Sequence, residues 1–297
     1  MDVPITAATG AAGGLAANEH GHGQLVGIRD VLLTANSNNL TWMHFYSMRL
    51  TTGIVTIVLM AASMGCSHSK KLRRALLEVE MIAIEGGSYT MGDVFEYENI
   101  DATPVHPVTV GDFKIARTEV TYGQYDAFAE AKGWALPPDD SLGRGSRAVV
   151  YVTWDEAAAF CDAYGYRLPT EEEWEFAARE RGKRLLYSGT NDEAAADAYV
   201  SYDRNTRPDQ TIVASRKPNA LGLFDMSGNV FEWVADYYAF YPNPEDEPVF
   251  EDLETNNMRV LRGGSFNSPL DAARTYWRSG TLRSIRSASV GFRCASD

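Results

Sequence analysis

The stretch Asn219-Ala-Leu-Gly-Leu-Phe-Asp-Met-Ser-Gly-Asn-Val-Phe-Glu-Trp233 interleaves glycines, carboxylates and aromatic residues. Gly222 and Gly228 permit backbone conformations that other residues avoid, so carbonyl groups on either side can turn toward one point. Asp225 and Glu232 could complete an oxygen cage there, and hard cations such as calcium bind to such oxygens. The alternative is a tight turn that leads into a strand burying the aromatic residues. These residues alone leave both interpretations open.

The composition indicates a globular, loop-rich α+β protein. The chain has 297 residues, of which 45% are hydrophobic and 11% aromatic, enough for one large domain or two small ones. Glycine, proline and tyrosine are plentiful and the apolar runs are short. A net charge of −13 argues against a nucleic-acid partner, which needs a basic surface. Three cysteines are too few for a disulfide scaffold, although one pair could form in an oxidising compartment.

The N-terminal part of the chain has the pattern of an export signal. Residues 1–47 are interpreted as a disordered or untranslated extension, because they lack a periodicity able to bury apolar surface. Residues 48–66 combine a positive start, a short apolar run and small residues before a break, which is typical of a signal peptide. Gly65-Cys66 resembles a bacterial lipobox, which predicts lipidation of Cys66. Plain secretion and a retained anchor remain the alternatives, and 67–78 is a polar tether.

Residues 79–297 form the predicted domain. Its first strands are expected as a hairpin over 81–92, turning at a Gly-Gly pair, and as a strand pair over 105–115 in which Pro107 is restricted to an edge. Strands are also expected at both ends of the C-terminal part, within 259–268 and 289–295.

Three capping boxes predict three helices. Each has a threonine followed three residues later by Gln or Glu, and the predicted helices cover 122–131, 154–164 and 171–181. The glycines at the expected helix ends are Gly133, Gly165 and Gly182. Cys161 falls on the apolar face of the second helix, which predicts that it is buried.

Seven motifs, in order, resemble those of the formylglycine-generating enzyme family, also called the sulfatase-modifying factor domain. They are Ile84-Glu-Gly-Gly-Ser-Tyr-Thr-Met-Gly92, Glu119-Val-Thr, Val152-Thr-Trp, Arg167-Leu-Pro-Thr-Glu, Gly222 to Trp233, Arg262-Gly-Gly-Ser-Phe266 and Gly291-Phe-Arg-Cys294. The resemblance implies a single irregular α+β domain related to C-type lectin-like folds, spanning 79–297.

Active members of this family oxidise a sulfatase cysteine to formylglycine with oxygen and with copper held by two cysteines. The resemblance places Ser268 and Ala273 at those two positions, and neither side chain can replace a thiolate toward soft copper. Copper binding is therefore not expected. Ser265 matches an active-site serine and Trp233 a tryptophan of the substrate-peptide groove, although Ser265 could instead cap a turn and Trp233 fill the core.

The resemblance also implies a disulfide and a metal site. Cys161 and Cys294 match the structural disulfide of the family. The calcium ligands implied by the resemblance are the backbone carbonyls of Ser227, Gly228 and Val230 and the carboxylate of Glu232. A carboxylate-capped turn remains the alternative.

Three functions are compared on this basis. The first is a binding or scaffold module in a bacterial cell envelope, lipid-anchored or free in the periplasm or outside the cell. Its ligand would be a peptide, protein or small molecule, with the membrane contacted only through the lipid anchor and no nucleic acid. The second is an enzyme that uses Ser265, Ser268, Asp271 and Tyr276 for different chemistry. The third is formylglycine generation.

Two further features are interpreted as structural. His106 is the only histidine after residue 68, which excludes a zinc site built on several histidines, and it is expected as an exposed or capped strand residue. The acidic run Glu245–Glu254 is interpreted as a solvated loop.

Overall fold

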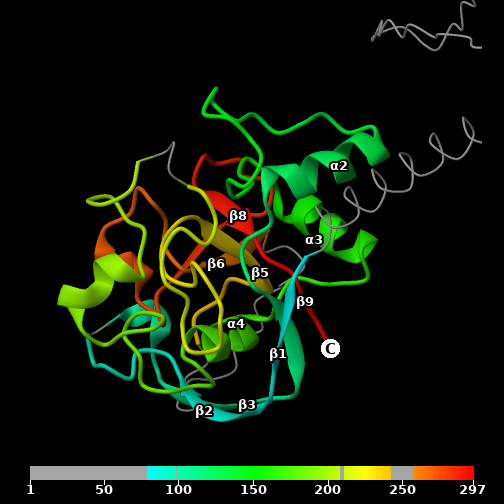
Figure 1. The fold of residues 1–297 in the computed structure, drawn as a ribbon. Helices are drawn as coiled ribbons and strands as arrows, with labels where there is room; N and C mark the ends of the chain where they lie inside the picture. Colours follow the sequence, from blue (N-terminus) through cyan, green and yellow to red (C-terminus); the bar gives the residue numbers. More distant parts are fainter. Residues whose placement is uncertain (1–78, 98, 208–210, 242–256) are drawn as a thin grey trace, which may run out of the picture. The chain divides into compact units, whose positions relative to one another are not determined.

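The computed structural model describes residues 79–97, 99–207, 211–241 and 257–297 (Figure 1). The predicted extension (1–47), signal peptide (48–66, with Cys66) and tether (67–78) lie outside the described residues, and so does the acidic run Glu245–Glu254. Within the described part of the chain, no helix has the length and apolar character needed to cross a membrane.

The first four strands form a bent antiparallel ribbon. These strands are β1 (Met81–Ile84), β2 (Gly87–Met91), β3 (His106–Val110) and β4 (Phe113–Ala116). β1 pairs with β4 and β2 pairs with β3, so the predicted hairpin with a turn at the Gly-Gly pair is wrong. Gly86 marks a bend instead of a reversal: a Cβ atom there would lie 2.4 Å from the carbonyl oxygen of Val110. The chain reverses between β2 and β3, and Pro107 lies in a strand with a single partner.

The three helices begin where the capping boxes predict. α2 (Tyr122–Lys132), α3 (Trp154–Ala163) and α4 (Glu171–Ala178) each have a threonine N-cap whose side chain accepts the N3 amide, with the reciprocal bond present. α4 ends three residues earlier than predicted, because Glu180 and Arg181 adopt positive φ angles of 48° and 67°.

A four-stranded sheet forms the centre of the C-terminal part. Its strands are β5 (Phe231–Tyr237), β6 (Met258–Arg262), β7 (Arg278–Leu282) and β8 (Val290–Phe292), in the order β7-β6-β5-β8. β5 and β8 are parallel and the other pairs antiparallel. The last strand, β9 (Ala295–Ser296), pairs with β4 instead, so the end of the domain joins its first sheet. Among the described residues, short 3-10 helices are η1 (Ile100–Ala102), η2 (Glu193–Ala198) and η4 (Leu270–Ala273).

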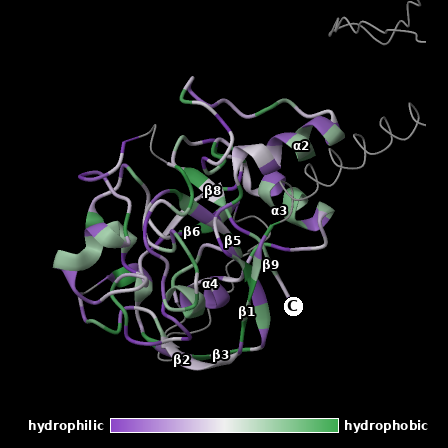
Figure 2. Ribbon diagram, in the orientation of Figure 1, coloured by the Kyte–Doolittle hydropathy of each residue, from purple (hydrophilic) through white to green (hydrophobic). Residues whose placement is uncertain are grey.

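Two hydrophobic clusters hold these elements together. One gathers β2, β3 and α4, and the other gathers α2, α3 and β8. The predicted Cys161–Cys294 disulfide lies in the second cluster, with a Cα–Cα distance of 5.6 Å, and both cysteines are fully buried. Hydrophilic residues also occur along α4, although this helix lies among the strands (Figure 2). The mixed, irregular α+β architecture predicted from the sequence is confirmed.

Candidate functional site

Two glycines shape the turn that follows β6. Gly263 and Gly264 have φ angles of 93° and 74°, a region that favours glycine. A Cβ atom on Gly264 would lie 2.7 Å from the carbonyl oxygen of Ala272 and 3.0 Å from the Cα of Ala273. The turn therefore packs at Gly264 directly against the end of η4, Ala272 and Ala273.

Ser265 and Ser268 form a chain of hydroxyl groups in this turn. The Ser265 hydroxyl donates to Asn267 Oδ1 at 2.6 Å and lies 2.7 Å from Ser268 Oγ. Since the Ser265 proton points to Asn267, the Ser268 hydroxyl is the donor in the second bond. Neither hydroxyl contacts a histidine or a carboxylate of the described residues, so no general base activates either serine as a nucleophile.

The two positions that the resemblance assigns to copper ligands lie on either side of this turn. Ser268 is 9% exposed, and Ala273, 1% exposed, accepts a hydrogen bond at its carbonyl from the Ser227 hydroxyl at 2.7 Å. The site thus presents a hydroxyl and a methyl group, and the cysteines of the described residues are joined in the disulfide. These side chains do not fit cuprous ion, which prefers thiolates.

Trp233 does not lie in a groove. Its side chain is 0% exposed, and its Nε1 donates to the carbonyl of Val152 at 3.1 Å. The role of a substrate-groove residue is therefore wrong for Trp233 in this chain, and the alternative of a core residue holds. The reason is that α3 and the segment before it pack over β5, which covers the indole.

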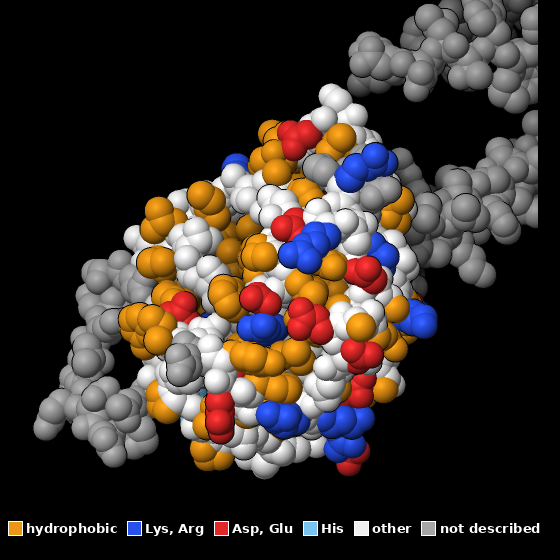
Figure 3. Space-filling model, turned by 90° about the vertical axis from the view of Figure 1, so that its left-hand side faces the viewer, with side chains coloured by type: hydrophobic (Ala, Val, Ile, Leu, Met, Phe, Trp, Pro, Cys, Tyr) orange, Lys and Arg blue, Asp and Glu red, His pale blue; other side chains and the backbone are white. Residues whose placement is uncertain are grey.

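A guanidinium between tyrosines lies next to the serine turn. Arg274 donates to Asp271 Oδ1 at 2.8 Å and to the Tyr276 hydroxyl at 3.3 Å, and its guanidinium lies 4.3 Å from the ring centroid of Tyr97. Burial raises the pKa of Tyr276 to about 12, so the phenol stays protonated at neutral pH. Figure 3 shows one face of the molecule, on which acidic and basic side chains lie close together among hydrophobic ones. A guanidinium beside aromatic rings, as Arg274 has here, is suited to recognising a ligand.

Glu232 is fully engaged by protein donors. Its carboxylate accepts two hydrogen bonds from Arg293, from Nε and Nη2, each at 2.7 Å, and a third from Trp174 Nε1 at 2.8 Å. Arg293 also donates to the carbonyls of Ala116 and Phe224, and both members of the ion pair are 0% exposed. A buried guanidinium therefore already neutralises the carboxylate expected to hold calcium.

The other expected calcium ligands lie in a loop held by contacts within the chain. A Cβ atom on Gly228 would lie 2.0 Å from the carbonyl oxygen of Ser201, which explains the glycine. The Ser227 hydroxyl accepts from the amide of Ser188 and donates to Ala273. A cation beside Glu232 would be repelled by Arg293. With its carboxylate paired to Arg293, Glu232 does not fit a calcium ligand, which favours the turn interpretation of this stretch, and the carbonyls of Ser227, Gly228 and Val230 stay a prediction.

A buried pair of acids lies beside this loop. The Asn229 side-chain amide donates to Glu119 Oε1 at 2.8 Å, and the amide of Ala214 donates to Asp225 Oδ2 at 2.7 Å. Burial raises the pKa of Glu119 well above its usual range and that of Asp225 to about 6. The sequence drew attention to Asp225 as an oxygen ligand and to Glu119 only as part of a motif, and the separation of 106 positions between the two acids leaves no local signal that they meet.

A second buried ionic network joins α4 to β6 and β7. Glu171 and Glu175 bind three arginines, with Arg262 bridging the two glutamates at 3.1 and 2.6 Å. The other two arginines are Arg179, which binds Glu175, and Arg278, which binds Glu171. Sequence reasoning missed this network; the available signal was that Glu171 and Glu175 lie four residues apart in a short helix that also carries Trp174, Phe176 and two alanines.

Asp236 gives a prediction about pH. It accepts the Glu171 amide at 2.7 Å, and burial, the leading cause, raises its pKa to about 6 from a usual value near 3.8. A group whose pKa is raised on folding stabilises the fold fully below its unfolded pKa and loses this contribution as the pH rises through the folded pKa. As the pH rises from roughly 4 to 6, we expect the contribution of Asp236 to the free energy of unfolding to fall by at most about 3 kcal/mol.

Urea unfolding at several pH values checks this expectation. Asp236→Asn keeps an acceptor and removes the charge, so the difference in unfolding free energy between variant and wild type should grow in favour of the variant from pH 4 to 7. The matched control is Glu130→Gln on α2, whose difference should stay flat. A flat difference for Asp236→Asn as well would show that its titration is not coupled to folding.

Two other expectations concern metal sites. The His106 ring lies edge-on to Tyr241 with its Nδ1 3.0 Å from the carbonyl oxygen of Pro104, so it is a capped strand residue as expected. In the described ranges, no group of three or more His, Cys, Asp or Glu residues is arranged to hold a metal ion.

Comparisons with known proteins give a consistent result for this fold and site. The family profile described as "Sulfatase-modifying factor enzyme 1-like domain" matches residues 68–297. A protein of Streptomyces coelicolor named "Formylglycine-generating enzyme" is 29% identical, over 73% of this chain and 88% of its own length. The mouse protein named "Inactive C-alpha-formylglycine-generating enzyme 2" is 30% identical, over 73% of this chain and 85% of its own.

Longer proteins and solved structures also match. "Serine/threonine-protein kinase Pkn1" of Chlamydia trachomatis is 33% identical over 74% of this chain, which spans only 39% of the kinase-named protein. The structure of PvdO from Pseudomonas aeruginosa matches with a TM-score of 0.63 at 26% identity, over 73% of this chain and 94% of its own. The Treponema denticola variable protein 1 matches with a TM-score of 0.62, also at 26% identity and with the same shares covered.

Proposed function

Because this chain belongs to the family of sulfatase-modifying factor enzyme 1-like domains, we propose that it is a binding or scaffold module without the copper-dependent oxidase activity of its enzymatic relatives. The observation that carries the proposal is the pair Ser268 and Ala273, which stands where the resemblance places the copper-binding cysteines. A relative named as inactive supports it, since loss of activity then has a precedent among similar proteins.

The geometry of the serine turn supports a role in binding more than in catalysis. The Ser265 hydroxyl donates to Asn267 and the Ser268 hydroxyl donates to Ser265, and no base among the described residues activates either serine. The exposed Tyr97 ring and the Arg274 guanidinium beside them offer planar and charged contacts to a peptide, protein or small-molecule ligand.

The proposed module acts in a bacterial cell envelope. The sequence of residues 48–66 supports export and lipidation at Cys66, which would anchor the domain by its lipid only. The Cys161–Cys294 disulfide supports an oxidising compartment such as the periplasm or the cell exterior.

A second candidate is an enzyme that performs different chemistry at the same turn. It is favoured by one observation, the continuous contact of Asp271, Arg274 and Tyr276 next to Ser268. A guanidinium and a protonated phenol can stabilise a developing negative charge.

A copper titration tests the loss of oxidase chemistry. The full chain is titrated with cuprous ion against a chromogenic chelator, with ascorbate as reductant so that the buried disulfide stays intact. We expect no transfer of copper from the chelator to the protein and no oxygen consumption with a thiol-containing sulfatase peptide. Tight cuprous binding together with peptide-dependent oxygen consumption would overturn the proposal and restore formylglycine generation.

A further inference from the structure

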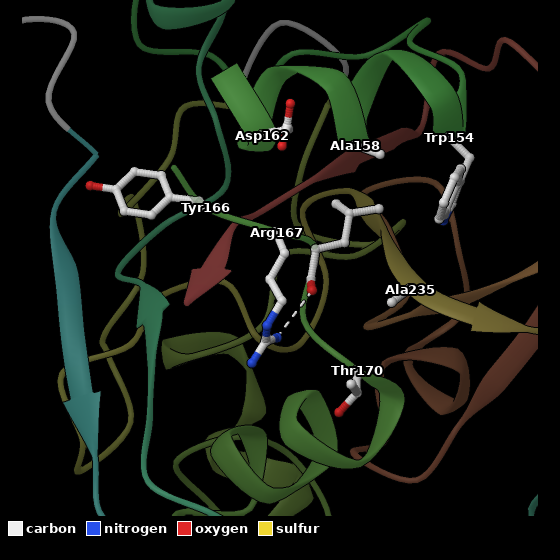
Figure 4. A pocket seen from close by; sticks show the side chains of 8 residues that line it. Trp154, Ala158, Asp162, Tyr166, Arg167, Thr170 and Ala235 are labelled. Atoms are coloured by element: carbon white, nitrogen blue, oxygen red, sulfur yellow. Dashed lines mark hydrogen bonds between the residues drawn. The ribbon is translucent and has the colours of Figure 1, made fainter. Parts of the chain in front are cut away.

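A cavity of about 280 Å³ lies between α3 and the segment that leads into α4 (Figure 4). Its lining residues are Trp154, Ala158, Asp162, Tyr166, Arg167, Leu168, Thr170 and Ala235. None of them belongs to the serine turn, so the cavity is separate from the site proposed above. Its volume is close to the lower end of the range for small-molecule sites.

The long wall of the cavity is one face of α3. Trp154, Ala158 and Asp162 are spaced four residues apart, so they lie along one side of the helix and span about 12 Å. Figure 4 shows Trp154 and Asp162 toward opposite ends of this face, with Ala158 between them. The cavity is therefore apolar in its middle, and its two ends differ in chemistry, with an indole at one and a carboxylate at the other.

The Trp154 end is rigid and already positively charged. The indole Nε1 donates to the carbonyl of Val234 at 2.7 Å, which fixes the ring. The guanidinium carbons of Arg259 and Arg283 lie 3.9 and 5.2 Å from the centroid of the Trp154 ring. Arg283 is paired with Asp155, so Arg259 supplies the positive charge at this end. A ligand cation would be repelled at this end.

The Asp162 end is negatively charged. Asp162 is exposed, and its carboxylate has no hydrogen-bond or ion-pair partner among the described residues. Nearby, Arg167 binds both Glu173, at 2.7 Å, and Asp297, at 2.6 Å. Arg167 with its two carboxylates already carries a net negative charge, and the unpaired Asp162 carboxylate adds to it, which favours a cation at this end.

We propose that this cavity binds a small organic cation, an alkylammonium or arylalkylammonium. The apolar part of the ligand contacts Ala158, Leu168 and Ala235, and its ammonium group pairs with the free carboxylate of Asp162. Arg259 at the other end sets this orientation by repulsion. The apolar contacts and one partly screened ion pair correspond to a dissociation constant on the order of 1 mM or below.

Ligand-observed saturation-transfer NMR on the full chain measures the binding, with 2-phenylethylamine as the probe and 2-phenylethanol as its neutral analogue. We expect saturable binding of the amine. The alcohol should bind with a dissociation constant about fivefold higher, which is the factor that one screened ion pair contributes to affinity. Asp162→Asn should weaken the amine by about the same factor and leave the alcohol unchanged. Ala158→Leu, which fills the middle of the cavity, should abolish binding of both.

The matched control is Glu130→Gln, which removes one exposed carboxylate from α2 and should leave the affinity for the amine unchanged. Melting temperatures of all variants show whether each is folded. The proposal is overturned if the wild type shows no saturable binding, if amine and alcohol bind equally, or if folded Asp162→Asn binds the amine as the wild type does. None of these results bears on the copper titration, so the two proposals fail separately.

Discussion

Replacing Glu232 by Gln is expected to lower the free energy of unfolding by about 3–5 kcal/mol, the usual cost of removing one partner from a buried ion pair. Arg293 is 0% exposed and both of its bonds to a carboxylate go to Glu232. The amide would turn at least one donor toward the guanidinium or lose the bond from Trp174. For a domain of this size we expect a fall in melting temperature of roughly 10 °C.

The control is Glu85→Gln, which breaks the exposed pair between Glu85 and Arg181 and should cost at most about 1 kcal/mol. Both variants and the wild type are melted with calcium and with chelator. Because Arg293 already neutralises Glu232, we expect the wild-type melting temperature to be the same in both. A calcium-dependent rise in the wild type that is lost in Glu232→Gln would mean that Glu232 is a calcium ligand after all.

Installing cysteines at both Ser268 and Ala273 is expected to create a high-affinity cuprous site. Ser268 is hydrogen-bonded to Ser265. A Cβ atom on Gly264, the residue before Ser265, would lie 3.0 Å from the Cα of Ala273, so the two positions belong to one small region. Two thiolates bind soft copper far more strongly than a hydroxyl and a methyl group do. The chelator competition described above measures the gain directly.

Two matched variants separate a built site from the mere presence of thiols. Ser268→Cys alone should bind copper weakly, because one thiolate is missing. Ser268→Cys with Ala272→Cys displaces the second thiol by one residue and should also bind weakly. If the displaced pair binds as tightly as the Ser268–Ala273 pair, these positions have no special geometry for copper, and the argument from the missing cysteines weakens.

The helices could be predicted from the sequence, whereas strand pairing could not. Capping boxes are local, since Thr121, Thr153 and Thr170 contact residues only three positions away. Strand pairing is decided by distant partners: β1 bonds to β4 and leaves β2 to β3. A Gly-Gly pair that is typical of a turn therefore marks a bend, because the register comes from residues some 30 positions later.

The site shows the same division between local and distant information. The disulfide was implied by a resemblance of motifs and is present. The burial of Trp233 under Val152 and the pairing of Glu232 with Arg293 join residues 81 and 61 positions apart, and no local pattern announces either contact. Motifs thus identified which residues matter, and tertiary packing decided what they do.

The pairing of β9 with β4 has a consequence for how the chain reaches its fold. Lys114 is opposite Ser296 and Ile115 is opposite Ala295, so the first sheet lacks its third strand until the last few residues of this domain have been synthesised. Contacts between residues so far apart in sequence slow folding, because the intervening loop must close first. The domain is therefore expected to fold as one unit, because its first sheet is complete only when β9 is available.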